Sequence, residues 1–488
     1  MGKEITQLEP QGVWQHFYAL TQIPRPSAHA DAALEHIKNT ALQLGYEAFR
    51  DECGNTIVRI PATAGMENRV GVILQGHADM VPQKNDNKQH DFKTDPIETI
   101  IDNGWVRANG TTLGADNGMG VAAAMAIMTD HKAEHGPLEI LVTIDEETSM
   151  LGASELKSGI LNGQILLNLD SETEGEVYIG CAGGLDVNAK FRYAQVETAE
   201  DDIAVKVSIS GLHGGHSGMD IHLGRANANK LLFRFLKYAA ANYEAMLAEV
   251  HGGNMRNAIP REAWAIITID SEDKEDFIEA VEEFEDMFRD EYSTTEQGLS
   301  FTAQIVEKPK MVMDEMSADD LINAIHGCPN GVMRMSAEMD NLVETSSNLA
   351  IVDSHDNIID VKMLVRSSVD SAKDDTASSI ESIMRLAGAE VEMSGDYPGW
   401  KPNPQSEALQ VVSNTYNSLF GKAPSVRAVH AGLECGIMAG TYPKWDMVSF
   451  GPTIEHPHSP SERVNIESVD RFYTLLKNIL RNIPEKRD

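Results

Sequence analysis

Three short apolar runs in the first part of the chain each end in histidine or acidic residues. They are VGVILQGHADM near 70–80, PLEILVTIDEE near 137–147 and ILLNLD at 165–170. The segment GADNGMGVAAAMAIMTDH, between the first two, predicts a helix whose small side chains allow close packing on a sheet. Strands that alternate with helices predict a largely parallel sheet covered on both faces. Ligands of such sheets bind beyond the carboxyl ends of the strands, where these polar residues would lie.

The pattern of the chain changes at about residue 187. Alternating strands such as DIAVKVSISG are interleaved there with long helical segments such as KEDFIEAVEEFEDMFRDEY, which is typical of an α+β domain. A similar pattern recurs after residue 310, which hints at two α+β halves, and the α/β pattern returns towards the C-terminus. The sequence therefore predicts a discontinuous catalytic domain, formed by residues 1–186 and 396–488, and an inserted domain formed by residues 187–395.

The composition restricts the partners and the compartment of the protein. The 488 residues include 75 acidic and 40 basic side chains, and the formal net charge is -35. A field of this sign repels phosphate backbones and anionic membranes, so we expect neither nucleic acid nor a membrane as a partner. The N-terminus has no apolar signal segment, and the four cysteines form no CxxC pair, which fits a reducing compartment. We therefore expect a cytoplasmic protein.

Acidic residues and histidines gather at the ends of the apolar strands and in two glycine- or proline-rich turns. Taken alone, any one of them could be a helix cap or a turn residue. Several buried carboxylates at one edge of a sheet, however, require cations or solvent. Imidazole together with carboxylate suits Zn²⁺, Co²⁺ or Mn²⁺, whereas an all-oxygen set suits Mg²⁺ or Ca²⁺. The candidate residues are His77, Asp79, Asp116, Glu146, Glu147, Asp170 and His458.

Longer motifs run essentially from end to end of the chain. They are GHADMVPQK, TTLGADNGMG, TIDEETSMLGA, LNLDSETEGEVYIGCAGG, GLHGGHSGMDIHLGRANANK, GGNMRNAIPREA, HAGLECG and GPTIEHPHSPSE. Through these motifs the chain resembles the di-zinc metallopeptidases that include aminoacylase-1, carboxypeptidase G2 and the carnosinases, and among them the bacterial aminoacyl-histidine dipeptidases. The resemblance implies a zinc-aminopeptidase-like, three-layer α/β catalytic domain with a mostly parallel sheet, interrupted by a large α+β lid domain.

The resemblance implies two divalent metal ions, zinc or else cobalt or manganese. His77 and Asp170 would hold one ion, and Glu147 and His458 would hold the other. Asp116 would bridge the two ions, which leaves both open to a shared water, as a catalytic site requires.

Three further features of the catalytic domain follow from the same resemblance. The family commonly has a cis peptide bond after the bridging residue, here Asp116–Asn117. Asp79 would orient His77 by accepting the other ring N–H. Glu146 would be the general base, which requires the strand to bend at its end, because adjacent residues of an extended strand point to opposite sides.

The inserted domain would supply substrate contacts. His216 of GGHSG would stabilise the oxyanion of the tetrahedral intermediate, and Asn257 and Arg366 would clamp the substrate, with Arg366 suited to a C-terminal carboxylate. Glu434 of HAGLECG is a candidate for binding a free α-amino group. The family also implies a homodimer formed through the lid, and the subunit from which His216 acts stays open.

The expected activity is hydrolysis of unblocked dipeptides, including Xaa-His and carnosine-like substrates. An N-acyl amino acid hydrolase or an exopeptidase with the same metal site is the first alternative, and the residue that meets the amino end of the substrate would distinguish it. A non-catalytic scaffold on the same fold is the second alternative. The presence of every ligand position together with Glu146 argues against it.

Overall fold

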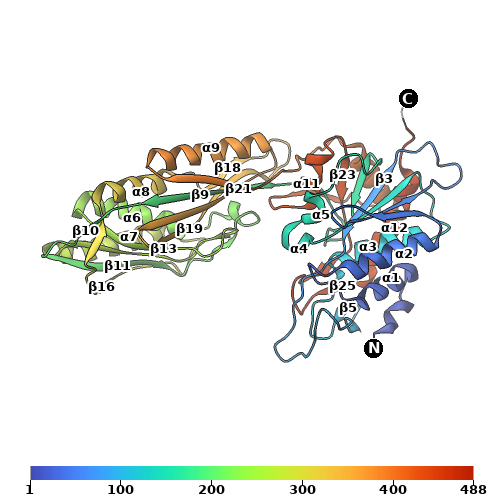
Figure 1. The fold of residues 1–488 in the computed structure, drawn as a ribbon, viewed down its shortest axis with the longest axis horizontal. Helices are drawn as coiled ribbons and strands as arrows, with labels where there is room; N and C mark the ends of the chain where they lie inside the picture. Colours follow the sequence, from blue (N-terminus) through green and yellow to red (C-terminus); the bar gives the residue numbers. More distant parts are fainter. Residues whose placement is uncertain (1, 487–488) are drawn as a thin grey trace. The chain divides into compact units, whose positions relative to one another are not determined.

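The computed structural model describes residues 2–486, which divide into two compact units (Figure 1). Unit 1 comprises Met1–Gly180, Pro402–Ala428 and Leu433–Asp488, and unit 2 comprises Cys181–Lys401 and Val429–Gly432. The borders differ by a few residues from those expected at 187 and 395, because the flanking strands β9 and β21 lie wholly in the sheet of unit 2. The four residues Val429–Gly432 also belong to unit 2, where the N–H of Ala182 donates to the carbonyl oxygens of Val429 and Ala431.

Unit 1 is built on an eight-stranded sheet with the order β1-β2-β6-β3-β7-β23-β8-β22. The four central strands, β6, β3, β7 and β23, are parallel, so their carboxyl ends share one edge of the sheet. The flanking strands β1, β2 and β8 pair antiparallel. The strands are β1 (Glu47–Arg50), β2 (Thr56–Ile60), β3 (Val72–His77), β6 (Leu138–Thr143), β7 (Ile165–Asn168), β8 (Glu176–Cys181), β22 (Ser425–Val429) and β23 (Asp446–Ser449).

Helices cover the sheet of unit 1 (Figure 1), and α3 packs closely on its strands. A Cβ atom added to Gly76 of β3 would lie 2.1 Å from Oδ1 of Asn117, and one added to Gly120 of α3 would lie 2.3 Å from the carbonyl oxygen of Leu169. The expected close approach of a small-residue helix to the strands is therefore confirmed. The helices are α1 (Gln11–Thr21), α2 (Asp31–Gln43), α3 (Ala115–Thr129), α4 (Glu146–Ser149), α5 (Leu151–Ser154), α10 (Glu407–Phe420), α11 (Glu434–Thr441) and α12 (Ile466–Asn482).

A second, four-stranded sheet in unit 1 joins two distant parts of the chain. Its order is β24-β25-β5-β4, with β24 (Ile454–Glu455), β25 (Arg463–Asn465), β5 (Trp105–Ala108) and β4 (Thr99–Asp102). The antiparallel pair β25–β5 holds the segment that carries His458 beside the segment that leads to Asp116.

Unit 2 contains one nine-stranded antiparallel sheet and the helices α6 to α9, which pack on a common hydrophobic core. The two expected halves share this sheet, but the strands β13 and β19 that join them pair over only two positions, His251 with Asp353 and Gly252 with Val352. The helices are α6 (Ala228–Tyr243), α7 (Lys274–Glu291), α8 (Glu315–Gly327) and α9 (Asp370–Leu386). The strands are β9 (Gly183–Arg192), β11 (Asp202–Ser210), β13 (Met246–Gly252), β15 (Ala263–Asp270), β16 (Ser300–Val306), β18 (Gly331–Met335), β19 (Val343–His355), β20 (Ile358–Ser367) and β21 (Glu390–Tyr397).

Two-stranded sheets complete unit 2. They pair β10 (Gln195–Glu197) with β17 (Met311–Met313), and β12 (Gly215–His216) with β14 (Ala258–Ile259). Across both units, none of the helices within residues 2–486 combines the length and the apolar character that a membrane crossing needs.

Candidate active site

The carboxyl edge of the parallel strands in unit 1 brings the candidate metal ligands together. His77 ends β3, Glu146 and Glu147 follow β6 at the start of α4, and Asp170 follows β7. Asp116 lies in the first turn of α3, and His458 lies in the turn between β24 and β25. The polar ends of the three apolar runs therefore meet at one edge, as parallel pairing requires.

Asp116 lies between the two histidines. Its Oδ1 is 3.1 Å from Nε2 of His77, and its Oδ2 is 3.2 Å from Nε2 of His458. Each histidine also faces a second carboxylate: Nε2 of His77 is 3.3 Å from Oδ1 of Asp170, and Nε2 of His458 is 2.9 Å from Oε2 of Glu147. Two groups of three ligand atoms result, each with all atoms within 4.8 Å of one another, and Asp116 belongs to both.

Two carboxylate oxygens of this cluster have no hydrogen-bond partner among the described residues. They are Oε1 of Glu147 and Oδ1 of Asp170, and both are buried. A buried carboxylate oxygen without a partner is costly, unless a cation takes that place. The donor set of two imidazoles and three carboxylates suits zinc, cobalt or manganese. The residues therefore fit a pair of divalent cations.

The pKa values show how strongly the charges of the cluster interact. Burial alone would lower the pKa of His77, but the charge of Asp170 and the hydrogen bonds that His77 donates to neighbouring carboxylates raise it well above the ordinary value. Hydrogen bonds to Asp116 and Glu147 raise the pKa of His458 to about 11. Burial raises the pKa of Asp170 to about 7 and that of Glu146 well above its ordinary value. Negative charge is thus concentrated here beyond what the two imidazoles neutralise.

Asp79 holds the end of β3 to the turn that follows β6. The Nδ1 atom of His77 is 3.1 Å from the carbonyl oxygen of Asp79 and 3.5 Å from its Oδ1, so the main chain lies nearer than the carboxylate expected to orient the ring. The carboxylate accepts hydrogen bonds from Oγ of Ser27 (2.7 Å) and from the N–H groups of Glu146 (3.1 Å) and Glu147 (3.4 Å). Asp79 thereby holds Ser27 and the backbone of Glu146 and Glu147 next to the end of β3.

The chain bends sharply between β6 and α4. The strand ends at Thr143, Asp145 has a left-handed φ of 50°, and α4 begins at Glu146. His77, Glu146 and Glu147 consequently offer ligand atoms within 4.8 Å of one another. The bend is the geometry that adjacent glutamates need to face the same site. The Asp116–Asn117 peptide bond is cis, as the resemblance predicted.

Glu434 begins α11 at the same edge of the sheet. Its side chain is buried, and Oε2 accepts hydrogen bonds from Nε2 of Gln75 (2.6 Å) and Oγ1 of Thr143 (2.9 Å). Its Oε1 has no hydrogen-bond partner within the described part of the chain. Burial raises the pKa of Glu434 to about 7, and His77 and Asp170 are close enough to influence it.

The other predicted site residues lie in unit 2, around the short strand β12. Nδ1 of the half-buried His216 accepts hydrogen bonds from the N–H groups of Gly218 (3.1 Å) and Met219 (3.0 Å). Burial, with the charge of Arg366, lowers the pKa of His216, so the ring is neutral at pH 7. Because Nδ1 is an acceptor, the ring proton lies on Nε2, which is free to act as a donor.

Arg366 is buried near His216 in the same unit. Its Nη1 donates to Oη of Tyr397 (3.0 Å) and its Nε to Oγ of Ser217 (3.4 Å). The exposed residue Asn257 lies beside them, since its carbonyl oxygen accepts the N–H of Ser217 (2.8 Å). The structure thus groups His216, Asn257 and Arg366 within unit 2, and the metal-ligand candidates with Glu434 within unit 1.

Sequence reasoning missed residues that hold these groups in place. Tyr397 contacts Arg366, and His430 contacts Oγ of Ser346 at 2.7 Å, with a pKa that burial lowers to about 3. Glu462 stands within the motif that carries His458, and that position was the only signal for it in the sequence.

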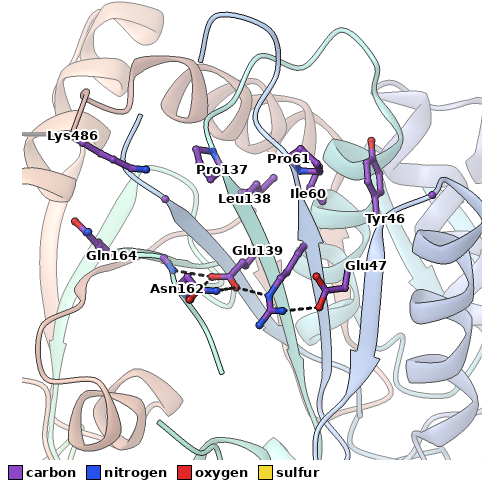
Figure 2. A pocket seen from close by; sticks show the side chains of 14 residues that line it. Tyr46, Glu47, Ile60, Pro61, Pro137, Leu138, Glu139, Asn162, Gln164 and Lys486 are labelled. Atoms are coloured by element: carbon purple, nitrogen blue, oxygen red, sulfur yellow. Dashed lines mark hydrogen bonds and ion pairs between the residues drawn. The ribbon is translucent and has the colours of Figure 1, made fainter. Parts of the chain in front are cut away.

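A separate pocket of about 440 Å³ lies at the opposite edge of the sheet in unit 1, at the amino ends of β3, β6 and β7 (Figure 2). Its buried carboxylate, Glu139, accepts hydrogen bonds from Nε of Arg59 (3.3 Å) and from the N–H groups of Asn162 (2.7 Å) and Gly163 (2.8 Å). Both oxygens of Glu139 therefore have partners, and the walls nearby are apolar, with Ile60, Pro61, Pro137 and Leu138. Among residues 2–486, no group of candidate metal ligands lies at this pocket.

Known proteins share both the sequence and the fold. Residues 73–482 match peptidase family M20/M25/M40. The chain is 45% identical over 484 residues to the cytosol non-specific dipeptidase of Escherichia coli (strain K12). This alignment covers 99% of this chain and 100% of the E. coli protein. The crystal structure of aminoacylhistidine dipeptidase from Vibrio alginolyticus matches with a TM-score of 0.96 and 44% identity over 99% of each chain.

A more distant structure, the aminopeptidase PepT of Bacillus cereus, shares the fold, with a TM-score of 0.58 and 15% identity over 98% of this chain and 99% of that one. The predicted resemblance and the predicted α/β fold with an inserted α+β domain are confirmed by these matches. The chain therefore belongs to peptidase family M20/M25/M40 and is a peptidase.

Proposed function

We propose that this protein hydrolyses the peptide bond of unblocked dipeptides at a two-metal site on the carboxyl edge of the unit 1 sheet. The observation that carries the proposal is Asp116, which presents one oxygen to each of two histidines, while each histidine faces a further carboxylate. Two metal ions that share one carboxylate suit the hydrolysis of an amide. The names of the relatives from E. coli and V. alginolyticus support dipeptides as the substrate class.

Five residues would hold the metals. His77 and Asp170 would bind one ion, Glu147 and His458 the other, and Asp116 both; zinc is the proposed metal, with cobalt and manganese as alternatives. Bound there, the ions would lower the pKa of a water molecule and polarise the scissile carbonyl group.

Glu146 would act as the general base. Its carboxylate lies beside the ligand Glu147 and within reach of the same group of atoms, so it can accept the proton of the attacking water. The same carboxyl group would then deliver that proton to the leaving amine. Nε2 of His216, which carries the ring proton, would donate a hydrogen bond to the oxyanion.

The two ends of a dipeptide would meet opposite charges. Arg366 would bind the C-terminal carboxylate, with Asn257 as a further clamp. Glu434 would bind the α-ammonium group through the oxygen that has no partner among residues 2–486. This pair of charges would favour substrates in which both ends are free.

We also propose that the protein is a cytoplasmic homodimer formed through unit 2. The location rests on the name of the E. coli relative, and the dimer rests on the resemblance to lid-containing metallopeptidases. Light scattering on purified protein measures the oligomeric state: twice the mass of one chain would support the dimer, and the mass of one chain would contradict it.

A substrate panel tests the proposed activity. Unblocked dipeptides, including Xaa-His and carnosine, are assayed beside their N-acetylated forms, first after chelation and then after return of Zn²⁺, Co²⁺ or Mn²⁺. We expect cleavage of the unblocked dipeptides only with metal. Preference for the N-acetylated forms would indicate the N-acyl hydrolase alternative, and metal binding without any turnover would indicate a scaffold.

A further inference from the structure

A single buried carboxylate receives the main chain that leads into Asp116. Oε2 of Glu462 accepts hydrogen bonds from the N–H groups of Leu113 (2.7 Å) and Gly114 (3.0 Å). Oε1 accepts from the N–H groups of Ala115 (2.7 Å) and Asp116 (3.3 Å). The Glu462 side chain is 2% exposed, so all four bonds form away from bulk solvent. Hydrogen bonds to a charged, buried acceptor are stronger than neutral ones.

Arg25 holds the same turn from its carbonyl side. Its Nη2 donates to the carbonyl oxygen of Gly114 (2.5 Å), and its Nη1 donates to the carbonyl oxygens of Ala78 (2.8 Å) and Asp79 (3.3 Å). The guanidinium group is also buried. Arg25 therefore ties the turn before α3 to the end of β3, where His77 lies.

Helix geometry does not fix the position of Asp116. Its φ and ψ angles of -81° and 114° are not helical, and Gly114, two residues before it, has a left-handed φ of 70°. A Cβ atom at Gly114 would lie 2.6 Å from Nη2 of Arg25 and 2.8 Å from Sδ of Met80, so the turn is closely enclosed. The carbonyl oxygen of Gly114 accepts the N–H of Gly118 (3.2 Å), but the first N–H groups of a helix have no acceptor within it, so these depend on the side chain that binds them.

We propose that Glu462 and Arg25 are positioning residues that hold Asp116 in the place where one carboxylate serves two metal ions. Glu462 follows His458 by four residues in the turn between β24 and β25. The segment that supplies one ligand therefore also fixes the backbone of the bridging ligand. The inference rests on the two-metal site proposed above, and it concerns metal affinity more than folding.

The test compares Glu462→Gln with Glu139→Gln. In E462Q, an NH₂ group replaces one oxygen and faces two backbone N–H donors, so two of the four hydrogen bonds that Glu462 accepts are lost. Glu139 is the matched control, because it too is a buried carboxylate that accepts two backbone N–H groups beside an arginine, but at the opposite edge of the sheet (Figure 2). Zinc affinity is measured by competition with a chromophoric chelator, and thermal unfolding is followed on the metal-free proteins.

We expect E462Q to bind zinc about 10- to 100-fold more weakly than the wild type, which is the usual effect of removing a residue that supports metal ligands. E139Q should lower the unfolding temperature but leave zinc affinity unchanged. Excess metal should restore turnover to E462Q, which a purely structural defect would not allow.

Three outcomes would overturn the inference. They are wild-type zinc affinity in folded E462Q, an equal loss of affinity in E462Q and E139Q, and turnover of E462Q that excess metal does not restore. If E462Q does not fold, Arg25→Lys provides the test. Lysine cannot donate to the carbonyl oxygens of both Gly114 and Ala78 in the same geometry. Unchanged zinc affinity in R25K would overturn the inference. A wild-type protein that binds no metal would instead contradict the proposed function itself.

Discussion

Both edges of the unit 1 sheet carry buried carboxylates, but these carboxylates differ in whether their oxygens have hydrogen-bond partners. At the amino edge, Glu139 is buried beside Arg59 and holds the turn at Asn162 and Gly163, and both of its oxygens have partners (Figure 2). At the carboxyl edge, Glu147, Asp170 and Glu434 each keep one buried oxygen without a hydrogen bond within residues 2–486. The amino edge has the pocket of about 440 Å³, yet both oxygens of its buried carboxylate, Glu139, accept hydrogen bonds. Buried carboxylate oxygens without hydrogen bonds, and not the volume of a cavity, distinguish the carboxyl edge, where we propose the metal site.

The largest expected effect comes from a carboxylate that would bind no metal. Glu146→Gln should lower kcat by about 100- to 10,000-fold, because the general base is lost. Metal content, measured by atomic emission, should stay at the wild-type level. E139Q at the amino edge should retain its turnover, and an active E146Q enzyme would remove Glu146 from the mechanism.

Metal binding at the carboxyl edge should stabilise the folded protein. At a metal concentration about 100 times the Kd, the free energy of unfolding should rise by about 2.7 kcal/mol for each bound ion, since the ions bind the folded state. Chemical denaturation with and without zinc measures this difference. In Asp116→Asn, which lacks the shared carboxylate, the gain should be much smaller. An equal gain in D116N would mean that the metal binds elsewhere.

Glu434→Gln tests what the unpartnered oxygen at the carboxyl edge is for. If it binds the substrate ammonium group, kcat/KM for unblocked dipeptides should fall about tenfold or more, as expected for a hydrogen bond between charged groups worth about 1.5–3 kcal/mol. The values for N-acetylated dipeptides should not change. An unaltered preference between the two substrate classes would contradict this role.

The smallest expected effect is a change in pH dependence. Burial raises the pKa of Glu434 from 4.5 to about 7 in the folded protein, so its contribution to stability is present below pH 4.5 and is lost as the pH rises to about 7. The metal-free wild type should therefore lose stability over this range, and E434Q should lose less. Urea denaturation at several pH values checks the difference, and identical slopes would show that Glu434 has its ordinary pKa.

The grouping of polar residues at the carboxyl edge could be predicted from the sequence because these residues follow buried strands directly. The runs that end at His77, Glu147 and Asp170 are apolar and short, and parallel pairing places their ends together. His458 follows no apolar strand: it became a candidate as a histidine in a proline-rich turn almost 300 residues after Asp170, and only the resemblance implied its role as a ligand. The antiparallel flanks of the sheet and the pairing of β25 with β5 leave no comparable signal in the sequence.

The supports of the site were the hardest part to predict. Glu462 and Arg25 act through backbone N–H and carbonyl groups, which every residue has, so no pattern in the sequence indicates their partners. That Val429–Gly432 belongs to unit 2 could not be predicted for the same reason. Its hydrogen bonds with Ala182 join main-chain atoms only, which every residue has.

The turn between β24 and β25 has a consequence for the order of events during protein synthesis. Four of the five proposed ligands leave the ribosome before any part of unit 2, whereas His458 emerges only after unit 2 has been translated. A nascent chain without His458 would thus have all the proposed ligands of one ion (His77, Asp116 and Asp170) but not those of the other. Hydrolytic competence would arise only after His458 has been translated, so products terminated before this residue would not cleave peptides.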